Sequence, residues 1–231
     1  MLATAEAEVN ADPTQCVVVD TNRIAWEATP HRGVHIKVLE RVNHPVKGRE
    51  TALFRLEPGA QMPAETLKER QEIFVLEGSF SDEQGSYGQH TWIWNPPGTR
   101  QSLSSAEGCV FYAKRRVPIY KDEARRSRTV VDTKSVKWLD FPHRGAEVLH
   151  LHRDPNGLET GRIGNVYTHR KLPSHNHSIG EDTFVVKGCL KDEYATYSTG
   201  VWFRMPCGVP HAPYTEDERC MMLIREGDLV W

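Results

Sequence analysis

Short stretches of apolar, β-branched and aromatic residues alternate with polar turn segments along most of the chain. Ile73–Leu76 and Thr183–Val186 are two such stretches, and each is soon followed by a glycine and a polar turn. Thr91–Trp94 and Val201–Arg204 have the same character and stop at a Pro-x-Gly turn. No apolar stripe with the 3.6-residue period of a helix is sustained outside the termini and the junction. The pattern predicts an all-β sandwich or barrel.

The strand pattern occurs twice, and individual residues recur with it. Val18–Thr21 and Pro30–Gly33 return 112 residues later as Val130–Thr133 and Pro142–Gly145. Further along, the offset is 110, and the recurring residues are Pro63, Phe74, Val75, Gly78, Asp82, Glu83, Tyr87, Trp92, Pro96 and Gly98. This many identities in one order indicate a tandem duplication of units of about 110 residues.

The repeat sets the expected domain boundaries. Residues 1–16 are rich in Ala and Glu and are predicted to form an arm or a short helix. The two repeated units are expected over residues 17–115 and 129–231. The Arg-rich junction between them, residues 116–128, has the charge to bind a phosphate or an acidic partner. We interpret it as a solvated linker or a short helix because Asp122 and Glu123 interrupt the basic run.

Histidines and one glutamate in the second unit are spaced as metal ligands would be. His175 and His177 are two residues apart, so in a strand both rings project from the same face. A turn can bring Glu181 back beside them, and His211 follows Pro206–Gly208 on a different predicted strand. Three imidazoles and one carboxylate suit Fe(II), Mn(II), Ni(II) or Zn(II), with positions left for water, substrate or oxygen. The alternative, surface histidines, explains the combined spacing less well.

Composition and charge narrow the range of functions. Apolar residues make up 39% of the chain, enough for a globular core. The 29 Lys and Arg do not exceed the 31 Asp and Glu, so no basic surplus favours nucleic acid or an anionic membrane. No apolar run approaches the roughly 18 residues of a spanning helix, and the first residues lack the order of a signal peptide. Five scattered cysteines without a Cys-x-x-Cys pair predict a reducing, cytoplasmic location.

The histidine motifs resemble those of the cupin superfamily. They read His175-x-His177-x3-Glu181-x6-Gly188 and Gly200-x5-Pro206-x-Gly208-x2-His211. One departure is His169, where the family usually has a glycine. Residues 74–83, 95–98 and 107–109 are similar to the ChrR-type cupins, named after the sensor domain of a zinc-binding anti-sigma factor. The resemblance covers about residues 18–228 and implies two tandem cupin jelly-roll barrels, each of six to eight strands.

The resemblance also implies a role for the motif residues of each unit. In the C-terminal barrel, one divalent transition metal (Fe, Zn, Ni or Mn) would be held by His175, His177, Glu181 and His211. The aligned residues of the first unit are Glu65, Leu67, Gln71 and Gln101. A leucine cannot coordinate a metal and neutral amides are poor ligands. We therefore expect the first barrel to keep its fold without a metal, as a packing partner or a small-molecule pocket.

Three further residues are candidates for catalysis. Tyr167 and His169 share a face with His175 by strand parity, provided that the strand is unbroken through Pro173. Either side chain would then act as an acid or base or would orient a substrate, and core packing is the competing interpretation. Tyr214 follows His211 and would close the mouth of the barrel.

Two classes of function remain open. The cupin family includes iron dioxygenases that cleave carbon–carbon bonds, which implies an Fe(II)-dependent dioxygenase acting on a small diketone or hydroxyketone. The alternative is a non-catalytic sensor or regulatory module that binds a metal or a small ligand. The helical domain with which the anti-sigma factor grips its partner has no counterpart expected in the residues before the first unit. Because duplicated β-barrels have edges to cover, we expect a homodimer.

Overall fold

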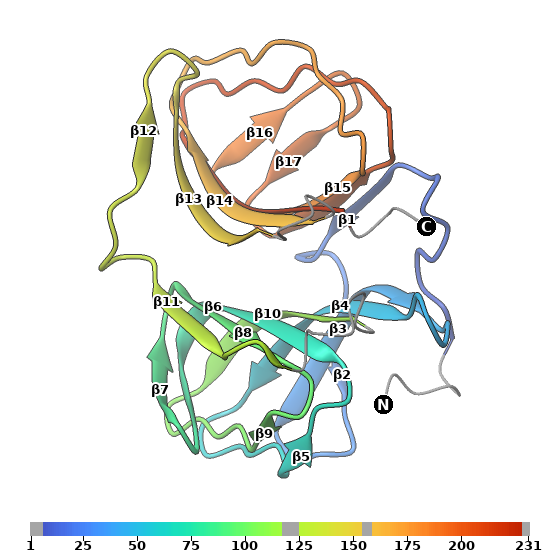
Figure 1. Ribbon diagram of the computed structural model, residues 1–231, viewed down its shortest axis with the longest axis vertical. Helices are drawn as coiled ribbons and strands as arrows, with labels where there is room; N and C mark the ends of the chain where they lie inside the picture. Colours follow the sequence, from blue (N-terminus) through green and yellow to red (C-terminus); the bar gives the residue numbers. More distant parts are fainter. Residues whose placement is uncertain (1–6, 117–124, 154–158, 228–231) are drawn as a thin grey trace. The chain divides into compact units, whose positions relative to one another are not determined.

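The computed structural model describes residues 7–116, 125–153 and 159–227, and these form two compact units (Figure 1). Unit 1 comprises Met1–Ala11 with Ala25–Val136, and unit 2 comprises Asp12–Ile24 with Lys137–Trp231. The described ranges contain β-strands and no α-helix, so the predicted all-β fold is confirmed. Residues 7–16 form an irregular arm, and its Val9 makes an isolated bridge with Arg41.

Within these ranges, no helical segment has the length and apolar character needed to cross a membrane.

Unit 1 is built on one large antiparallel sheet. Its strands are ordered β11-β8-β6-β10-β4-β3-β2, β7 pairs with β6, and β5 forms a separate ribbon with β9. The bounds are β2 Glu27–Ala28, β3 Val34–Val42, β4 Arg49–Leu56, β5 Glu65–Thr66, β6 Arg70–Asp82, β7 Gly85–Gly88, β8 Thr91–Asn95, β9 Arg100–Gln101, β10 Cys109–Arg116 and β11 Thr129–Asp132. The side chains inside include the stacked rings of Phe54 and Phe111, whose centroids are 5.4 Å apart.

Unit 2 repeats this plan. Its large sheet is ordered β1-β18-β15-β19-β14-β13-β12, and β16 and β17 form a separate ribbon that faces the curved sheet in Figure 1. The bounds are β1 Val17–Asp20, β12 Leu139–Phe141, β13 Ala146–Arg153, β14 Thr160–Val166, β15 Glu181–Lys187, β16 Cys189–Lys191, β17 Thr196–Ser198, β18 Val201–Met205 and β19 Cys220–Glu226. Tyr197 and Phe203 stack at 4.1 Å in its core.

The first strand of each sequence repeat is exchanged. Strand β1 precedes the strands of unit 1 in the chain but pairs with β18 of unit 2, and β11 pairs with β8 of unit 1. The repeated threonine after each strand holds the exchange in place. The Thr21 hydroxyl donates to Gly200 O at 2.7 Å, and the Thr133 hydroxyl donates to His90 O at 2.9 Å. The compact units therefore differ from the sequence ranges 17–115 and 129–231 by these exchanged strands.

The predicted linker over 116–128 is only partly within the described residues. Residues 117–124 lie outside them. At its end, Arg128 belongs to unit 1, where its Nη2 lies 2.6 Å from Asp82 Oδ2 and its Nε donates to Asn95 Oδ1 at 2.7 Å. This part of the junction is therefore bound into a barrel by an ion pair.

Candidate metal centre

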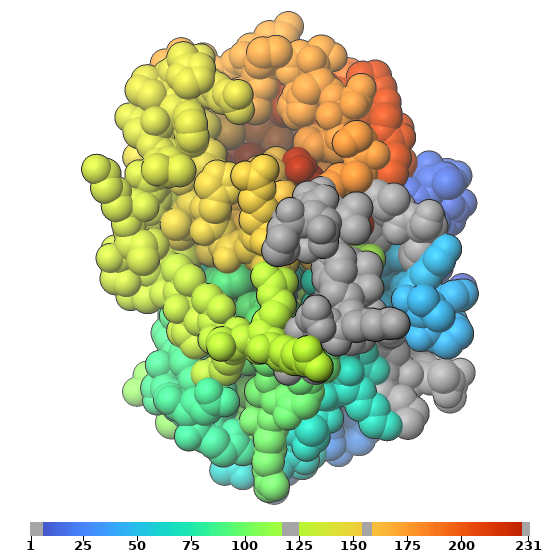
Figure 2. Space-filling view, in the orientation of Figure 1, coloured from blue at the N-terminus to red at the C-terminus, as the bar shows by residue number. Residues whose placement is uncertain are grey.

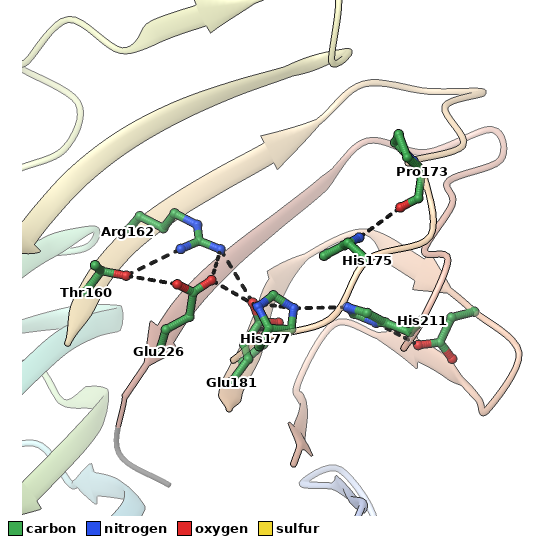
Figure 3. Close-up of polar contacts among 10 residues, drawn as sticks. Thr160, Arg162, Pro173, His175, His177, Glu181, His211 and Glu226 are labelled. Atoms are coloured by element: carbon green, nitrogen blue, oxygen red, sulfur yellow. Dashed lines mark hydrogen bonds and ion pairs between the residues drawn. The ribbon is translucent and has the colours of Figure 1, made fainter. Parts of the chain in front are cut away.

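Three histidine rings come together inside unit 2 (Figure 3). His175 and His211 form an isolated antiparallel bridge, with backbone hydrogen bonds of 3.0 and 2.8 Å. Their ring centroids are 4.6 Å apart, and His177 lies 5.1 Å from the ring of His175 and 5.3 Å from that of His211. His175 and His177 lie in the irregular segment between β14 and β15 rather than in a strand. The bridge to His211 holds this segment where a strand was expected.

Each of the three rings is anchored through Nδ1. A partner that only accepts hydrogen bonds selects the tautomer with a proton on Nδ1, which leaves the lone pair of Nε2 free. All three partners are of this kind; for His175, His177 and His211 in turn they are Pro173 O at 2.9 Å, Glu226 Oε1 at 3.0 Å and Asp192 Oδ2 at 3.2 Å. The cluster therefore presents three Nε2 atoms as ligands.

Two of these nitrogens lie close enough together to bind the same cation. His177 Nε2 and His211 Nε2 are 3.1 Å apart, and both rings are buried. Two lone pairs at this separation repel each other, whereas a metal ion that accepts both turns the contact into an attraction. Histidine ligands in proteins are commonly oriented in this way, by an outer carboxylate or carbonyl on the other ring nitrogen. The donor set thus fits a divalent transition metal.

Carboxylates adjoin the histidines on one side. Glu181, the first residue of β15, has its Oε2 3.4 Å from His177 Nε2, and its Oε1 accepts from the Thr183 hydroxyl at 3.0 Å. Two groups of potential ligands result: the three histidines form one, and His177, Glu181 and Glu226 form the other. The four residues predicted from the sequence are therefore divided between two clusters that share His177.

Arg162 and His177 keep Glu226 ionised. Arg162, on β14, donates to Glu226 Oε1 at 2.7 Å and lies 3.5 Å from Glu181 Oε2. Burial alone would raise the pKa of the Glu226 carboxyl, but hydrogen bonds from His177 and Arg162 outweigh it and lower that pKa to about 2. Burial would lower the pKa of His177, yet the neighbouring carboxylates raise it. Two carboxylates against one guanidinium make the site favourable for a cation.

Asp192 is a second fixed anion, behind His211. Besides the imidazole, it accepts from the Tyr197 hydroxyl at 2.9 Å and from the backbone nitrogens of Tyr194 and Ala195 at 2.9 and 3.0 Å. Burial opposes ionisation, but these hydrogen bonds dominate and lower the pKa of Asp192. The orientation of His211 is therefore set before any ligand arrives.

Comparison with known families identifies the fold. The family model described as the ChrR cupin-like domain matches residues 14–117 and again 126–230. The chain belongs to the ChrR cupin-like family. This confirms both the predicted family and the tandem arrangement of its two cupin barrels. No curated protein matches the sequence significantly.

Solved structures share the cupin fold at low sequence identity. A "putative dioxygenase" from Nostoc punctiforme has 17% identity and a TM-score of 0.77, over 92% of this chain and 82% of its own. A "putative glyoxylate induced protein" from Pseudomonas aeruginosa has 15% identity and a TM-score of 0.75, over 96% and 91%. An oxalate decarboxylase–formate complex from Lactobacillus farciminis has 12% identity and a TM-score of 0.68, over 99% and 89%. At these identities the likeness extends to the fold alone.

The structure does not bring two of the catalytic candidates to the histidines of this ChrR cupin-like domain. The expected continuous strand ends at Val166. The Tyr167 hydroxyl donates to Asp140 at 2.6 Å. This hydrogen bond is the main reason why the pKa of the Tyr167 phenol is raised to about 12. His169 is exposed, has a φ of 53° and lies 3.5 Å from Asp217. Tyr214 is half-buried and its backbone pairs with that of Lys191.

Sequence reasoning missed the residues around the ligands. Asp192 carried a signal, because it recurs in the duplication as Asp82, but no motif linked it to a histidine. Glu226 carried none, since it lies 49 residues after His177 and the contact depends on how β19 pairs with β15. Arg162 was missed for the same reason.

In Figure 2, unit 2, coloured yellow to red, is hollowed in the middle. Red atoms from the last part of the chain are visible at the bottom of this hollow. Among the three clustered histidines, His175 is exposed, whereas His177 and His211 are buried.

Proposed function

We propose that unit 2 binds one divalent transition metal through the Nε2 atoms of His175, His177 and His211, with Glu181 as the carboxylate ligand. The observation that carries this proposal is the anchoring of all three Nδ1 atoms by acceptors, which leaves Nε2 as the ligand atom of each ring. The ligand atoms of the three histidines lie within 4.8 Å of one another. Glu181 lies 3.4 Å from His177 Nε2, within reach of the same ion after a small side-chain adjustment.

We further propose that the protein is an Fe(II)-dependent dioxygenase acting on a small diketone or hydroxyketone. Four protein ligands leave two positions of an octahedron for other groups, and Fe(II) there would supply the redox and Lewis-acid chemistry. The residues of the chain would hold this centre in shape: Arg162 fixes Glu181 and Glu226, and Asp192 fixes His211. The dioxygenase and decarboxylase names among the fold neighbours are consistent with such chemistry.

Oxygen consumption tests the dioxygenase proposal. Protein loaded anaerobically with Fe(II) is mixed with pentane-2,4-dione, other small diketones and hydroxyketones in an oxygen-electrode cell. We expect consumption of O₂ in proportion to one of these substrates and its loss in His211→Gln. Bound iron without oxygen uptake on the whole panel would favour the alternative, a metal-dependent sensor module, for which membership in the ChrR cupin-like family is the supporting observation.

The metal content should be about one ion per chain, because among the described residues the cluster of three histidines lies in unit 2. In unit 1, Leu67 takes the place of His177 and is buried, and Gln71 and Gln101 are amides. Elemental analysis of the purified chain measures this ratio. Two ions per chain would mean that Glu65 and the two glutamines coordinate a metal after all.

Asp192→Asn should lower the metal affinity of the chain about 10- to 100-fold, the usual effect of changing a group that orients a ligand. The asparagine keeps the volume but removes the charge that holds the proton on Nδ1 of His211. Competition against a chromogenic chelator measures the affinity. Asp82→Asn is the matched control, since Asp82 is the equivalent residue of unit 1 and pairs with Arg128 instead of a histidine. Equal losses in both variants would contradict the proposed role.

A further inference from the structure

An arginine lies among the former ligand positions of unit 1. In the strand pairings, Arg115 faces Gln71, just as Glu226 faces Glu181 in unit 2. Its Nη2 lies 2.5 Å from Glu65 Oε1. With the Gln71 amide oriented so that its oxygen faces the guanidinium, this oxygen accepts from Arg115 Nε and Nη2 at 3.1 and 3.2 Å. The guanidinium of Arg115 therefore occupies the position in unit 1 that corresponds to the carboxylate of Glu226 in unit 2.

The polar end of this site is neutral as a whole but strongly dipolar. Gln71 and Gln101 are uncharged, and Asn95 donates to Gln101 Oε1 at 3.2 Å. Arg128, which donates to Asn95, is paired with Asp82. Facing the cavity are the guanidinium of Arg115 and the carboxylate of Glu65, whose side chains are 17% and 35% exposed. A ligand with one charge would be attracted to one residue of this pair and repelled by the other: an anion by Glu65, a cation by Arg115. A ligand with both charges would match both.

A cavity of about 330 Å³ adjoins this pair. Its walls include Val34, Phe54 and Met62, and its polar lining consists of Glu65 and Arg115 together with Thr29 and His31. The volume is at the lower end of the range for small-molecule sites, and such sites combine apolar walls with a few polar groups. A second hollow of about 790 Å³ shares Met62 and neighbouring residues with it.

We propose that unit 1 binds a small α-amino acid with an apolar side chain, of the size of leucine or methionine. The ligand carboxylate accepts from Arg115, the ammonium donates to Glu65, and the side chain lies against Phe54 and Met62. Arg115 then exchanges the carboxylate of Glu65 for that of the ligand, and Glu65 exchanges the guanidinium for the ligand ammonium. Neither charge is left without an opposite charge beside it. The first barrel is then a ligand-binding domain in its own right.

Isothermal titration calorimetry on the full-length, chelator-treated chain tests this proposal. The chelator is needed because free amino acids bind transition metals and would otherwise report on unit 2. L-Leucine and L-methionine are expected to bind with one site per chain. 4-Methylpentanoate and 3-methylbutylamine, which each lack one charged group of leucine, are expected to bind roughly tenfold more weakly or worse.

Variants locate the site. Arg115→Gln and the cavity-filling Phe54→Trp should each weaken leucine binding roughly tenfold or more, whereas His211→Gln should leave it unchanged. Should Phe54→Trp fail to fold, Met62→Trp fills the cavity from a half-buried position. The proposal is overturned if neither amino acid binds at millimolar concentration, if 4-methylpentanoate binds as tightly as leucine, or if the filled cavity still binds it.

Discussion

Replacing His211 with glutamine is expected to abolish stoichiometric metal binding while unit 2 stays folded. The substitution removes one of three converging Nε2 atoms, and loss of a ligand should exceed the 10- to 100-fold effect typical of an outer partner. Folding should be kept because the backbone bridge between His211 and His175 does not involve the ring. Gln101, at the same place in unit 1, is a buried glutamine in an intact barrel. Elemental analysis and thermal melting of the variant measure the two effects.

His169→Gln is the matched control for this substitution. It also exchanges one imidazole for an amide in unit 2, but the His169 side chain is 71% exposed and faces Asp217. Metal content should stay at the parental level. Full occupancy in His211→Gln would exclude His211 from the site. A variant that does not fold would identify the metal as a structural requirement, which favours the sensor module over the dioxygenase.

The sequence was sufficient to predict the barrels but not the exchange of their first strands. Alternating residues fix which face of a strand is buried, and the duplication shows that the pattern was used twice. Val17–Asp20 and Thr129–Asp132 are nearly the same strand, however, so either could pair with β8 or with β18. The choice depends on the path of the connecting chain, which local patterns do not record.

Within the site, the sequence identified ligands more readily than the residues that orient them. His175, His177 and His211 were found because the motif spacing is short or follows a Pro-x-Gly turn. Glu226 reaches His177 only through the register of β19 on β15. A register is a property of two paired strands, so no local pattern could have indicated it. The homodimer and the cytoplasmic location stay predictions.

Gly78→Ala is expected to destabilise unit 1 by about 3–5 kcal/mol, a loss typical of strain that the backbone cannot relieve. Gly78 has a φ of +66°, and a Cβ placed on it would lie under 3.0 Å from the carbonyl oxygen of Gly108, closer than real Cβ atoms come. That oxygen belongs to the backbone beside β10, so it cannot rotate away as a side chain would. Gly188 is in the same situation in unit 2, where a Cβ would meet the carbonyl oxygen of Arg219. Urea unfolding followed by circular dichroism measures the loss.

Gly98→Ala separates the two causes of this strain. Gly98 lies in the same unit and has a φ of +88°, but a Cβ there would meet nothing within 4 Å. Its substitution should therefore cost only the left-handed conformation, about 1–2 kcal/mol. The difference between the two variants is the contribution of the close approach between Gly78 and Gly108. Equal losses of stability in the two variants would show that the contact between Gly78 and Gly108 relaxes freely. Gly78 and its repeat Gly188 would then be required for their positive φ alone.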